Sequence, residues 1–219
     1  MIQHEVHKLM PELAERKIVS IVRGVRSKDI VEAAEAVYRG GIRFLEVTFD
    51  MASEENSRDT LRSIALLQEH FAGRMHIGAG TVLTPEQVEA AAKAGAEFMI
   101  SPDMDVAVIH KTKELGLLSM PGAMTPSEVK TAWMAGADIV KIFPASLLGP
   151  AYVKAIKAPL SQVKLAAVGG ISVENIRTYL DAGYDGFGIG GNLINKDRAE
   201  RHAWDELTRI AQAYTDAIR

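Results

Sequence analysis

Lys141 is the only charged residue in a short apolar stretch that runs from Ile139 to Phe143. Such a stretch is typical of a parallel strand covered on both faces, and Pro144 ends it because proline has no N–H to donate. A buried ammonium is costly unless it is paired or loses its proton. A lysine whose pKa is lowered by burial is the usual amine nucleophile for a carbonyl group. The structural alternative is a salt bridge to a carboxylate, and this stretch alone leaves both open.

Glu46 is a second ionisable residue within an apolar run, between Leu45 and Val47. Directed inward, its side chain would enter the interior of the fold, either as a general acid/base beside the amine or in a salt bridge to Lys141 or Arg23. An anionic Glu46 opposes proton loss from Lys141, whereas a neighbouring cation such as Arg23 favours it. We therefore expect Glu46 to avoid tight contact with the amine or to act through a water.

The elements that must position these residues follow a repeated pattern, in which a helix ends in glycine and an apolar strand follows. Alternating strands and helices predict a parallel sheet. Eight such units predict an α/β fold, a single-domain (β/α)8 TIM barrel over residues 1–219 with an N-terminal capping helix. An open doubly wound sheet is the alternative, but Gly-x-Gly-x-x-Gly is absent after the first strand. The predicted strands are 18–23, 43–48, 75–79, 97–101, 117–120, 138–142, 164–168 and 185–189.

Helix starts are predicted from capping residues. Ser27, Ser53, Thr84 and Thr125 each precede a helical segment, and proline follows the two threonines, as suits a first helical turn. The last helix is predicted to run from about residue 198 to 218.

In such a barrel the active site lies at the carboxyl ends of the strands. Arg23 ends the first predicted strand, and Thr81 follows the third, where its hydroxyl could bind a carboxylate or serve only as a turn residue. Glycine-rich loops follow the last two strands, a place where barrels commonly bind phosphate through backbone N–H groups. Two plain tight turns are the alternative for these loops, which are Gly169-Gly170 and Gly190-Gly191-Asn192.

Composition excludes several classes of function. The 219 residues include no cysteine, and this absence points to an intracellular, cytoplasmic protein. The net charge of −3 comes without a basic stripe, so no nucleic-acid partner is expected. No apolar run approaches the roughly 20 residues of a membrane span, and the N-terminus lacks a signal peptide's apolar core. The six histidines are scattered, so no metal and no other cofactor is expected.

Five colinear motifs resemble one enzyme family, the 2-keto-3-deoxy-6-phosphogluconate and 4-hydroxy-2-oxoglutarate aldolases. The resemblance extends from about Ile18 to Asn192. The motifs are Leu45-Glu-Val-Thr48, Gly78-Ala-Gly-Thr-Val-Leu83, Pro121-Gly-Ala-Met-Thr-Pro126, Val140-Lys-Ile-Phe-Pro144 and Val168-Gly-Gly-Ile171.

The resemblance implies a (β/α)8 barrel, usually trimeric, that needs no cofactor and acts on a keto acid. It implies Lys141 as the Schiff-base lysine, Glu46 as the acid/base and Thr81 as a ligand of the pyruvate carboxylate. It further implies Phe143 as a substrate-binding residue, and a phosphate site built from Gly169, Gly170, Gly190, Gly191 and Asn192.

The chain departs from the family pattern after Glu46. Many members have arginine at the position where Asp50 stands, and that arginine binds the carboxylate. Arg23, in Ile21-Val-Arg-Gly24, is the cation that we expect to replace it. This Arg-Gly pair and the segment from Gly149 to Lys154 resemble the phosphogalactonate branch, and Asn192 stands where several relatives have serine.

The expected activity is class I aldol cleavage, through a lysine Schiff base, to pyruvate and an aldehyde. The substrate would be a 2-keto-3-deoxy-6-phospho sugar acid of the gluconate or galactonate type, or 4-hydroxy-2-oxoglutarate. Two alternatives remain: a sugar-phosphate isomerase or epimerase in which Lys141 is only electrostatic, and a non-catalytic phosphometabolite-binding barrel.

Overall fold

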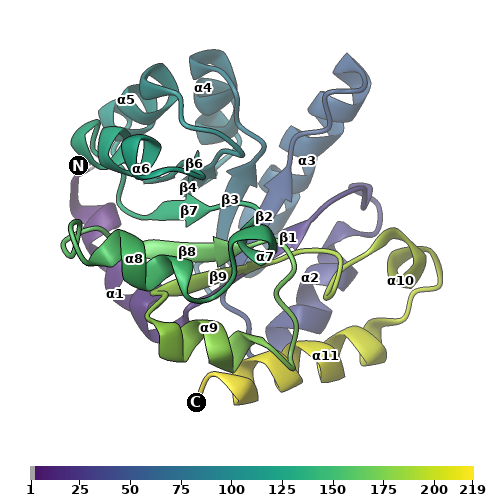
Figure 1. The fold of residues 1–219 in the computed structure, drawn as a ribbon. Coiled ribbons are helices and arrows are strands. Elements are labelled where there is room, and N and C mark those ends of the chain that lie inside the picture. Colours follow the sequence, from purple (N-terminus) through teal and green to yellow (C-terminus); the bar gives the residue numbers. More distant parts are fainter. Residues whose placement is uncertain (1–2) are drawn as a thin grey trace.

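The structure, a computed structural model, describes residues 3–219, and the side chains of the first helix from residue 9 onward. Strands alternate with helices, and the helices surround the strands (Figure 1). The strands are β1 (Ile18–Val22), β2 (Phe44–Thr48), β3 (His76–Gly80), β4 (Phe98–Ile100), β5 (Leu118–Met120), β6 (Gly122–Ala123), β7 (Val140–Ile142), β8 (Leu165–Val168) and β9 (Gly186–Ile189). The helices are α1 (Gln3–Arg16), α2 (Ile30–Arg39), α3 (Glu54–Phe71), α4 (Pro85–Lys93), α5 (Val106–Glu114), α6 (Pro126–Met134), α7 (Ala145–Leu148), α8 (Tyr152–Lys157), α9 (Ile176–Ala182), α10 (Lys196–Glu200) and α11 (Trp204–Ala217).

The strands form one parallel sheet in the order β5-β4-β3-β2-β1-β9-β8-β7-β6. Its two ends, β5 and β6, are consecutive pieces of one chain segment divided at Pro121, which cannot donate to a ladder. The β5 piece pairs with β4 and the β6 piece with β7, so the sheet curls into an eight-stranded barrel that is nearly closed. The predicted barrel and all eight predicted strand positions are confirmed.

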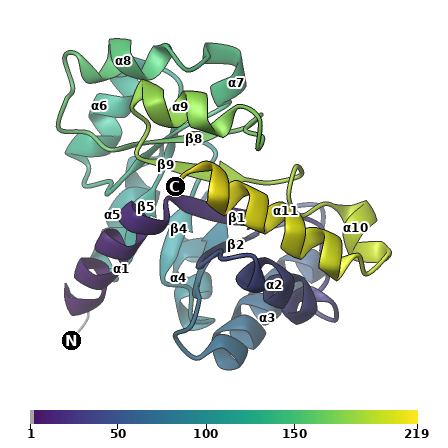
Figure 2. The same ribbon diagram turned by 90° about the horizontal axis from the view of Figure 1, so that it is seen from below.

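The amino end of the barrel has an apolar floor. Inward side chains from five strands, together with Ile139 just before β7, pack there, and Leu9 and Leu13 of α1 cover them, so α1 caps this end as predicted (Figure 2). Because successive side chains of a strand alternate between faces, the inward residues of the next layer stand two positions further along each strand. The floor residues are Val19, Phe44, Phe98, Leu118, Ile139 and Ala166.

An acidic residue one or two positions before each of three strands, β4, β7 and β9, performs the same task. The carboxylate of Glu97 accepts hydrogen bonds from the Ile77 backbone N–H of the neighbouring strand and from Gln68 on α3. Asp138 accepts from the Ser119 N–H and Lys113. Asp185 repeats the arrangement with the Leu165 N–H and Lys157. Each acid thus ties a strand to its neighbour and to a surrounding helix.

The outer layer of the core lies between the strands and the helices. Outward residues such as Leu45 and Ile77 pack there with helix residues such as Val37 and Leu67. Helix α11 lies beside α2, where Gly40 permits close approach because a Cβ there would stand 2.3 Å from Ala211 Cβ (Figure 2). No helix within residues 3–219 combines the length and the hydropathy that crossing a membrane requires.

Helix boundaries agree with the sequence where a cap is local. Ser53, Thr84 and Thr125 cap α3, α4 and α6, the two threonines in full capping boxes. Ser27 does not cap a helix, because its hydroxyl donates to Asp59 at 2.6 Å and α2 starts only at Ile30. The predicted last helix is divided into α10 and α11, with His202 between them at a positive φ of 49°.

Candidate active site

Strand alternation directs two ionisable side chains into the barrel above its floor. On β2, Glu46 lies two residues beyond the floor residue Phe44, and in the β7 segment Lys141 lies two beyond Ile139. Both side chains are almost fully buried, with 2% and 6% of their surface exposed. The barrel interior therefore holds a carboxyl and an amine within one layer.

A pocket of about 510 Å³ lies above this layer, where the strands end. All of the residues that the sequence singled out for a site line it: Lys141, Glu46, Arg23, Thr81, Phe143, Gly169, Gly170, Gly190, Gly191 and Asn192. Eight further residues line the pocket and were not predicted as site residues: Ile21, Pro102, Val168, Ile171, Gly188, Ile194, Asn195 and Lys196. Because side chains alternate between the two faces of a strand, Ile21 lies on the same face as Arg23 and could have been predicted. No sequence spacing indicated Lys196.

Burial dominates the electrostatics of Lys141. Loss of water around the ammonium lowers the pKa of Lys141 below its ordinary value, and the charge of Arg23 lowers it further, while Glu46 and Asp103 oppose the shift. In the part of the chain that the structure describes, Lys141 has no ion pair within 4.0 Å. Its Nζ instead stands 4.7 Å from the centre of the Phe143 ring. A neutral, nucleophilic amine is thereby accessible nearer to neutral pH.

Burial is also the largest influence on the pKa of Glu46, which it raises. Desolvation raises the pKa of Glu46 to about 7, although the charges of Lys141 and Arg23 act to lower it. Its Oε2 is buried without a hydrogen-bond partner among the described residues, and it forms no ion pair there. The salt-bridge alternative for this residue is therefore not the observed arrangement. A carboxyl with a pKa near 7 can both accept and donate a proton at neutral pH.

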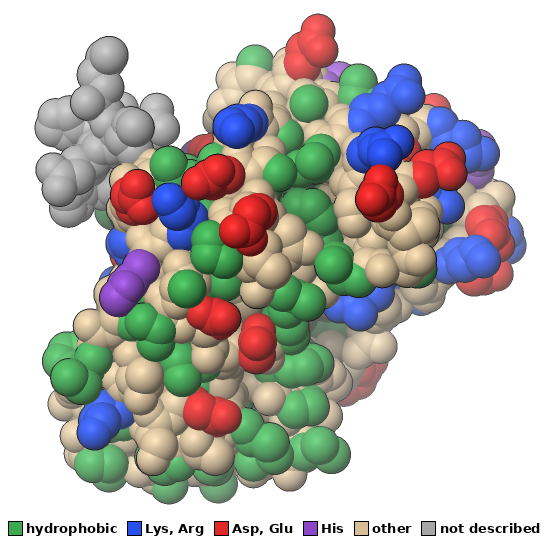
Figure 3. All heavy atoms as spheres, turned by 90° about the horizontal axis from the view of Figure 1, so that it is seen from above, with side chains coloured by type: hydrophobic (Ala, Val, Ile, Leu, Met, Phe, Trp, Pro, Cys, Tyr) green, Lys and Arg blue, Asp and Glu red, His purple; other side chains and the backbone are tan. Residues whose placement is uncertain are grey.

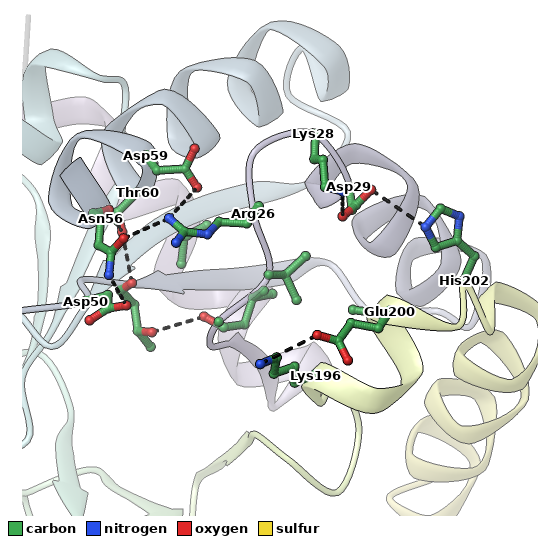
Figure 4. Close-up of a pocket in the computed structure, with 16 residues that line it drawn as sticks. Arg26, Lys28, Asp29, Asp50, Asn56, Asp59, Thr60, Lys196, Glu200 and His202 are labelled. Atoms are coloured by element: carbon green, nitrogen blue, oxygen red, sulfur yellow. Dashed lines mark hydrogen bonds and ion pairs between the residues drawn. The ribbon is translucent and has the colours of Figure 1, made fainter. Parts of the chain in front are cut away.

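Arg23 and Asp50 occupy different surroundings. The Arg23 guanidinium is exposed at the end of β1 and lines the pocket of Lys141. Asp50 lines a neighbouring pocket, where its carboxylate accepts hydrogen bonds from the Ala52 N–H and from Asn56, which in turn accepts one from Arg26 (Figure 4). The acid that stands where the resembling family often has arginine thus lines a different pocket from that of Lys141, where its charge would repel a carboxylate.

The glycine-rich loops present backbone to the pocket. Gly169 and Gly170 have φ of 94° and 77°, a region that favours glycine, and a Cβ on Gly170 would stand 2.4 Å from Ser146 Cβ. Within the described residues, the backbone N–H groups of Gly170, Gly191 and Asn192 donate to no protein acceptor. The Asn192 side chain donates to the Ile171 carbonyl at 2.8 Å and so ties the two loops together.

Thr81 has a strained backbone. Its φ of 56° lies in the left-handed region, which a β-branched residue adopts rarely and at a cost of about 1–3 kcal/mol. The strained residue lines the cavity beside Glu46. Such strain persists only where the surrounding structure holds the residue in place, and it is found most often at sites that bind ligands.

The chain is similar to known proteins over most of its length. The model of the family described as "Aldolase: KDPG and KHG aldolase" matches residues 9–210. A 2-dehydro-3-deoxy-6-phosphogalactonate aldolase of Escherichia coli strain K12 is 34% identical over 92% of this chain and 96% of its own length.

Two solved structures are similar over the same range. One, titled "Native KDPGal structure", has a TM-score of 0.81 and 34% identity and covers 91% of this chain and 93% of its own. The other is a KDPG aldolase from Legionella pneumophila with pyruvate captured as a covalent carbinolamine intermediate. It has a TM-score of 0.82 and 29% identity over 92% of this chain and 95% of its own.

The opposed influences on Lys141 predict the behaviour of two variants. Glu46→Gln removes an anion, so the pKa of Lys141 should fall further; Arg23→Ala removes a cation, so it should rise towards the ordinary value. Acetylation by acetic anhydride reports the neutral amine. Measured against pH by peptide mass spectrometry, acetylation of Lys141 should set in at lower pH in Glu46→Gln and at higher pH in Arg23→Ala.

The exposed Lys28, in the same digests, is the internal reference and should not change. Shifts of Lys141 in the same direction in both variants, or no shift in either, would contradict the electrostatic account.

Proposed function

Because the chain belongs to the KDPG and KHG aldolase family, we propose that its substrate is a 2-dehydro-3-deoxy-6-phospho sugar acid, with the galactonate type preferred. The protein is a class I aldolase that releases pyruvate. The observation that carries the finer proposal is that three residues lining the cavity of Lys141 have backbone N–H groups without a protein acceptor among the described residues. Donors of this kind bind phosphate. The galactonate preference is supported by the relative in Escherichia coli.

Lys141 is proposed to carry the covalent step. Its neutral amine attacks the C2 carbonyl of the keto acid, and loss of water gives a cationic imine. The imine accepts the electrons of the C3–C4 bond as that bond breaks, which gives an enamine and a free aldehyde. Protonation of the enamine at C3 and hydrolysis of the imine then release pyruvate and restore the amine.

Glu46 is proposed to move the protons. In cleavage it takes the proton of the C4 hydroxyl while the C3–C4 bond breaks, and it returns a proton to C3 of the enamine. A pKa of about 7 suits both roles, because the carboxyl then exchanges its proton readily at neutral pH. Its lack of an ion pair with Lys141 leaves both groups available for substrate.

The two ends of the substrate need separate anion sites. Arg23 and Thr81 are proposed to bind the carboxylate next to C2, since the planar guanidinium suits two parallel hydrogen bonds. Gly169 and Gly170, with Gly190, Gly191 and Asn192, are proposed to hold the phosphate at the far end, and Phe143 to pack against the substrate. The family match favours cleavage over an isomerase, an epimerase or a non-catalytic binding protein.

We further propose that residues 1–219 act as one catalytic domain in a cytoplasmic homotrimer, with neither nucleic acid nor membrane as a partner. Support for self-association comes from large apolar side chains exposed around α6 and α7: Trp133 (42%), Met134 (70%) and Leu147 (75%). In Figure 3 hydrophobic surface is prominent in the lower half of the view, where these elements lie. Exposed apolar patches of this kind are typical of protein–protein contacts.

A panel of four substrates tests the proposal. It comprises the galactonate-type and gluconate-type 2-dehydro-3-deoxy acids, each with and without the 6-phosphate, assayed by pyruvate release. We expect the phosphorylated galactonate type to give the highest kcat/KM. Loss of the phosphate should lower kcat/KM by about 30-fold or more, the typical effect of losing one partner of a charged contact. Equal rates with and without phosphate would refute the phosphate site, and no pyruvate from any compound would refute the cleavage.

Arg23→Ala tests the carboxylate site. If Arg23 binds the carboxylate, pyruvate alone should bind at least about 10-fold more weakly, because a hydrogen bond between two charged groups is lost. Imine formation with pyruvate, measured over a range of pH, separates this loss from the changed protonation of Lys141. Arg23→Lys should restore only part of the affinity, since an ammonium lacks the fork.

Arg26→Ala is the matched control, because Arg26 lies in the neighbouring pocket, bonded to Asn56 (Figure 4). It should leave pyruvate binding unchanged. An Arg23→Ala enzyme that binds pyruvate normally but no longer prefers phosphorylated substrates would instead assign Arg23 to the phosphate.

A further inference from the structure

The inner face of β3 carries no side chains at two successive inward positions, Gly78 and Gly80. A Cβ on Gly78 would stand 2.2 Å from the Phe98 ring, so this glycine makes room for an apolar floor residue. A Cβ on Gly80 would stand 1.5 Å from Oε1 and 2.2 Å from Cδ of Glu46. The φ of Gly80 lies outside the left-handed region, so space rather than backbone conformation requires glycine there.

The register of the strands shows how Glu46 reaches this place. Its Cα is level with Gly78, and Thr48 is level with Gly80. The Glu46 side chain therefore leans along the strand direction, towards the mouth, and lays its carboxyl on the backbone of β3. The inner face of a strand offers a carboxylate few donors, because ladder N–H groups point sideways to neighbouring strands. Oε2 accordingly has no partner among the described residues.

We propose that Gly80 is a positioning residue for proton transfer: its missing side chain seats the Glu46 carboxyl against β3 and so keeps it from pairing with Lys141. A methyl group at position 80 would push the carboxyl off β3 and further into the barrel interior, where the Lys141 side chain is also buried. An ion pair there would hold the amine protonated, so that it could not attack C2, and would hold the carboxylate to Lys141, away from the C4 hydroxyl. The inference rests on the proposed role of Glu46.

The position of the Glu46 carboxyl against β3 also accounts for its raised pKa. Against β3 the carboxyl is desolvated and unpaired, and the pKa of Glu46 is raised to about 7. Displaced towards Lys141 and water, it would return towards the ordinary range. The pH at which Glu46 gains its proton is therefore a readout of its position.

A set of substitutions tests whether Gly80 positions the Glu46 carboxyl. Gly80→Ala should lower the rate of deuterium exchange at the pyruvate methyl group by about 10²-fold, the scale of a 1 Å misplacement. It should also move the acidic limb of the pH profile of this exchange to lower pH. Glu46→Asp shortens the side chain by one methylene, which removes the close contact with a methyl at position 80. The double variant Glu46→Asp/Gly80→Ala should therefore exchange within about threefold of Glu46→Asp alone, whereas independent effects would multiply. This comparison holds even where Gly80→Ala alone does not fold.

Gly78→Ala is the matched control, because it places a methyl on the same strand face against Phe98 rather than Glu46. Glu46→Asp should not rescue it. Multiplying effects of Gly80→Ala and Glu46→Asp, or exchange in Gly80→Ala within threefold of the unaltered enzyme, would overturn the inference. If Glu46→Gln exchanges normally, the proposed role of Glu46 itself is wrong. If Glu46→Gln is inactive and Gly80→Ala is not, only the inference about Gly80 fails.

Discussion

The structure depends on one constraint: a carboxyl and an amine are buried in the same barrel and yet form no ion pair with each other. Burial disfavours the charged form of both, so the pKa of Glu46 rises to about 7 and that of Lys141 falls below its ordinary value. A direct pair would cancel these shifts, because each charge would stabilise the other. The fold therefore has to desolvate both groups and still keep them apart.

The barrel meets this demand through its layers. The apolar floor and the covering residues of α1 exclude water from below, and the acids Glu97, Asp138 and Asp185 tie strands at that end to their neighbours and to helices. Above the floor, Gly80 on β3 leaves space for the carboxyl of Glu46. Stability is thus concentrated at the amino ends of the strands, and the reactive groups lie at the carboxyl ends, as in other barrels.

Sequence periodicity was sufficient for the architecture, because each strand carries its own apolar pattern and each unit repeats the last. The helix ends at Thr84 and Thr125 were equally local, since a capping box involves only four adjacent residues. Ser27 was misjudged because Asp59, distant in sequence, takes its hydroxyl. The break at His202 likewise had no signal in the local pattern, whereas the division at Pro121 follows from proline's missing N–H.

The candidate site was predicted in composition but not in arrangement. Residues at strand ends gather at one mouth whenever the strands are parallel, so Lys141, Glu46 and the glycine loops could be placed together in advance. The orientation of Asp50 could not, because it follows from a hydrogen bond to Asn56 on α3. The sequence does carry a signal for Glu97, Asp138 and Asp185, because each stands two residues after a helix-ending glycine.

The central claim is that Lys141 forms the Schiff base, and reductive trapping tests it most directly. The protein would be incubated with pyruvate and sodium borohydride, denatured, digested and mapped by mass spectrometry, with Lys141→Arg as the control. The account predicts one reduced pyruvyl group per chain, located on Lys141 and absent from the control. A label on another lysine, or no label at all in the folded protein, would contradict it.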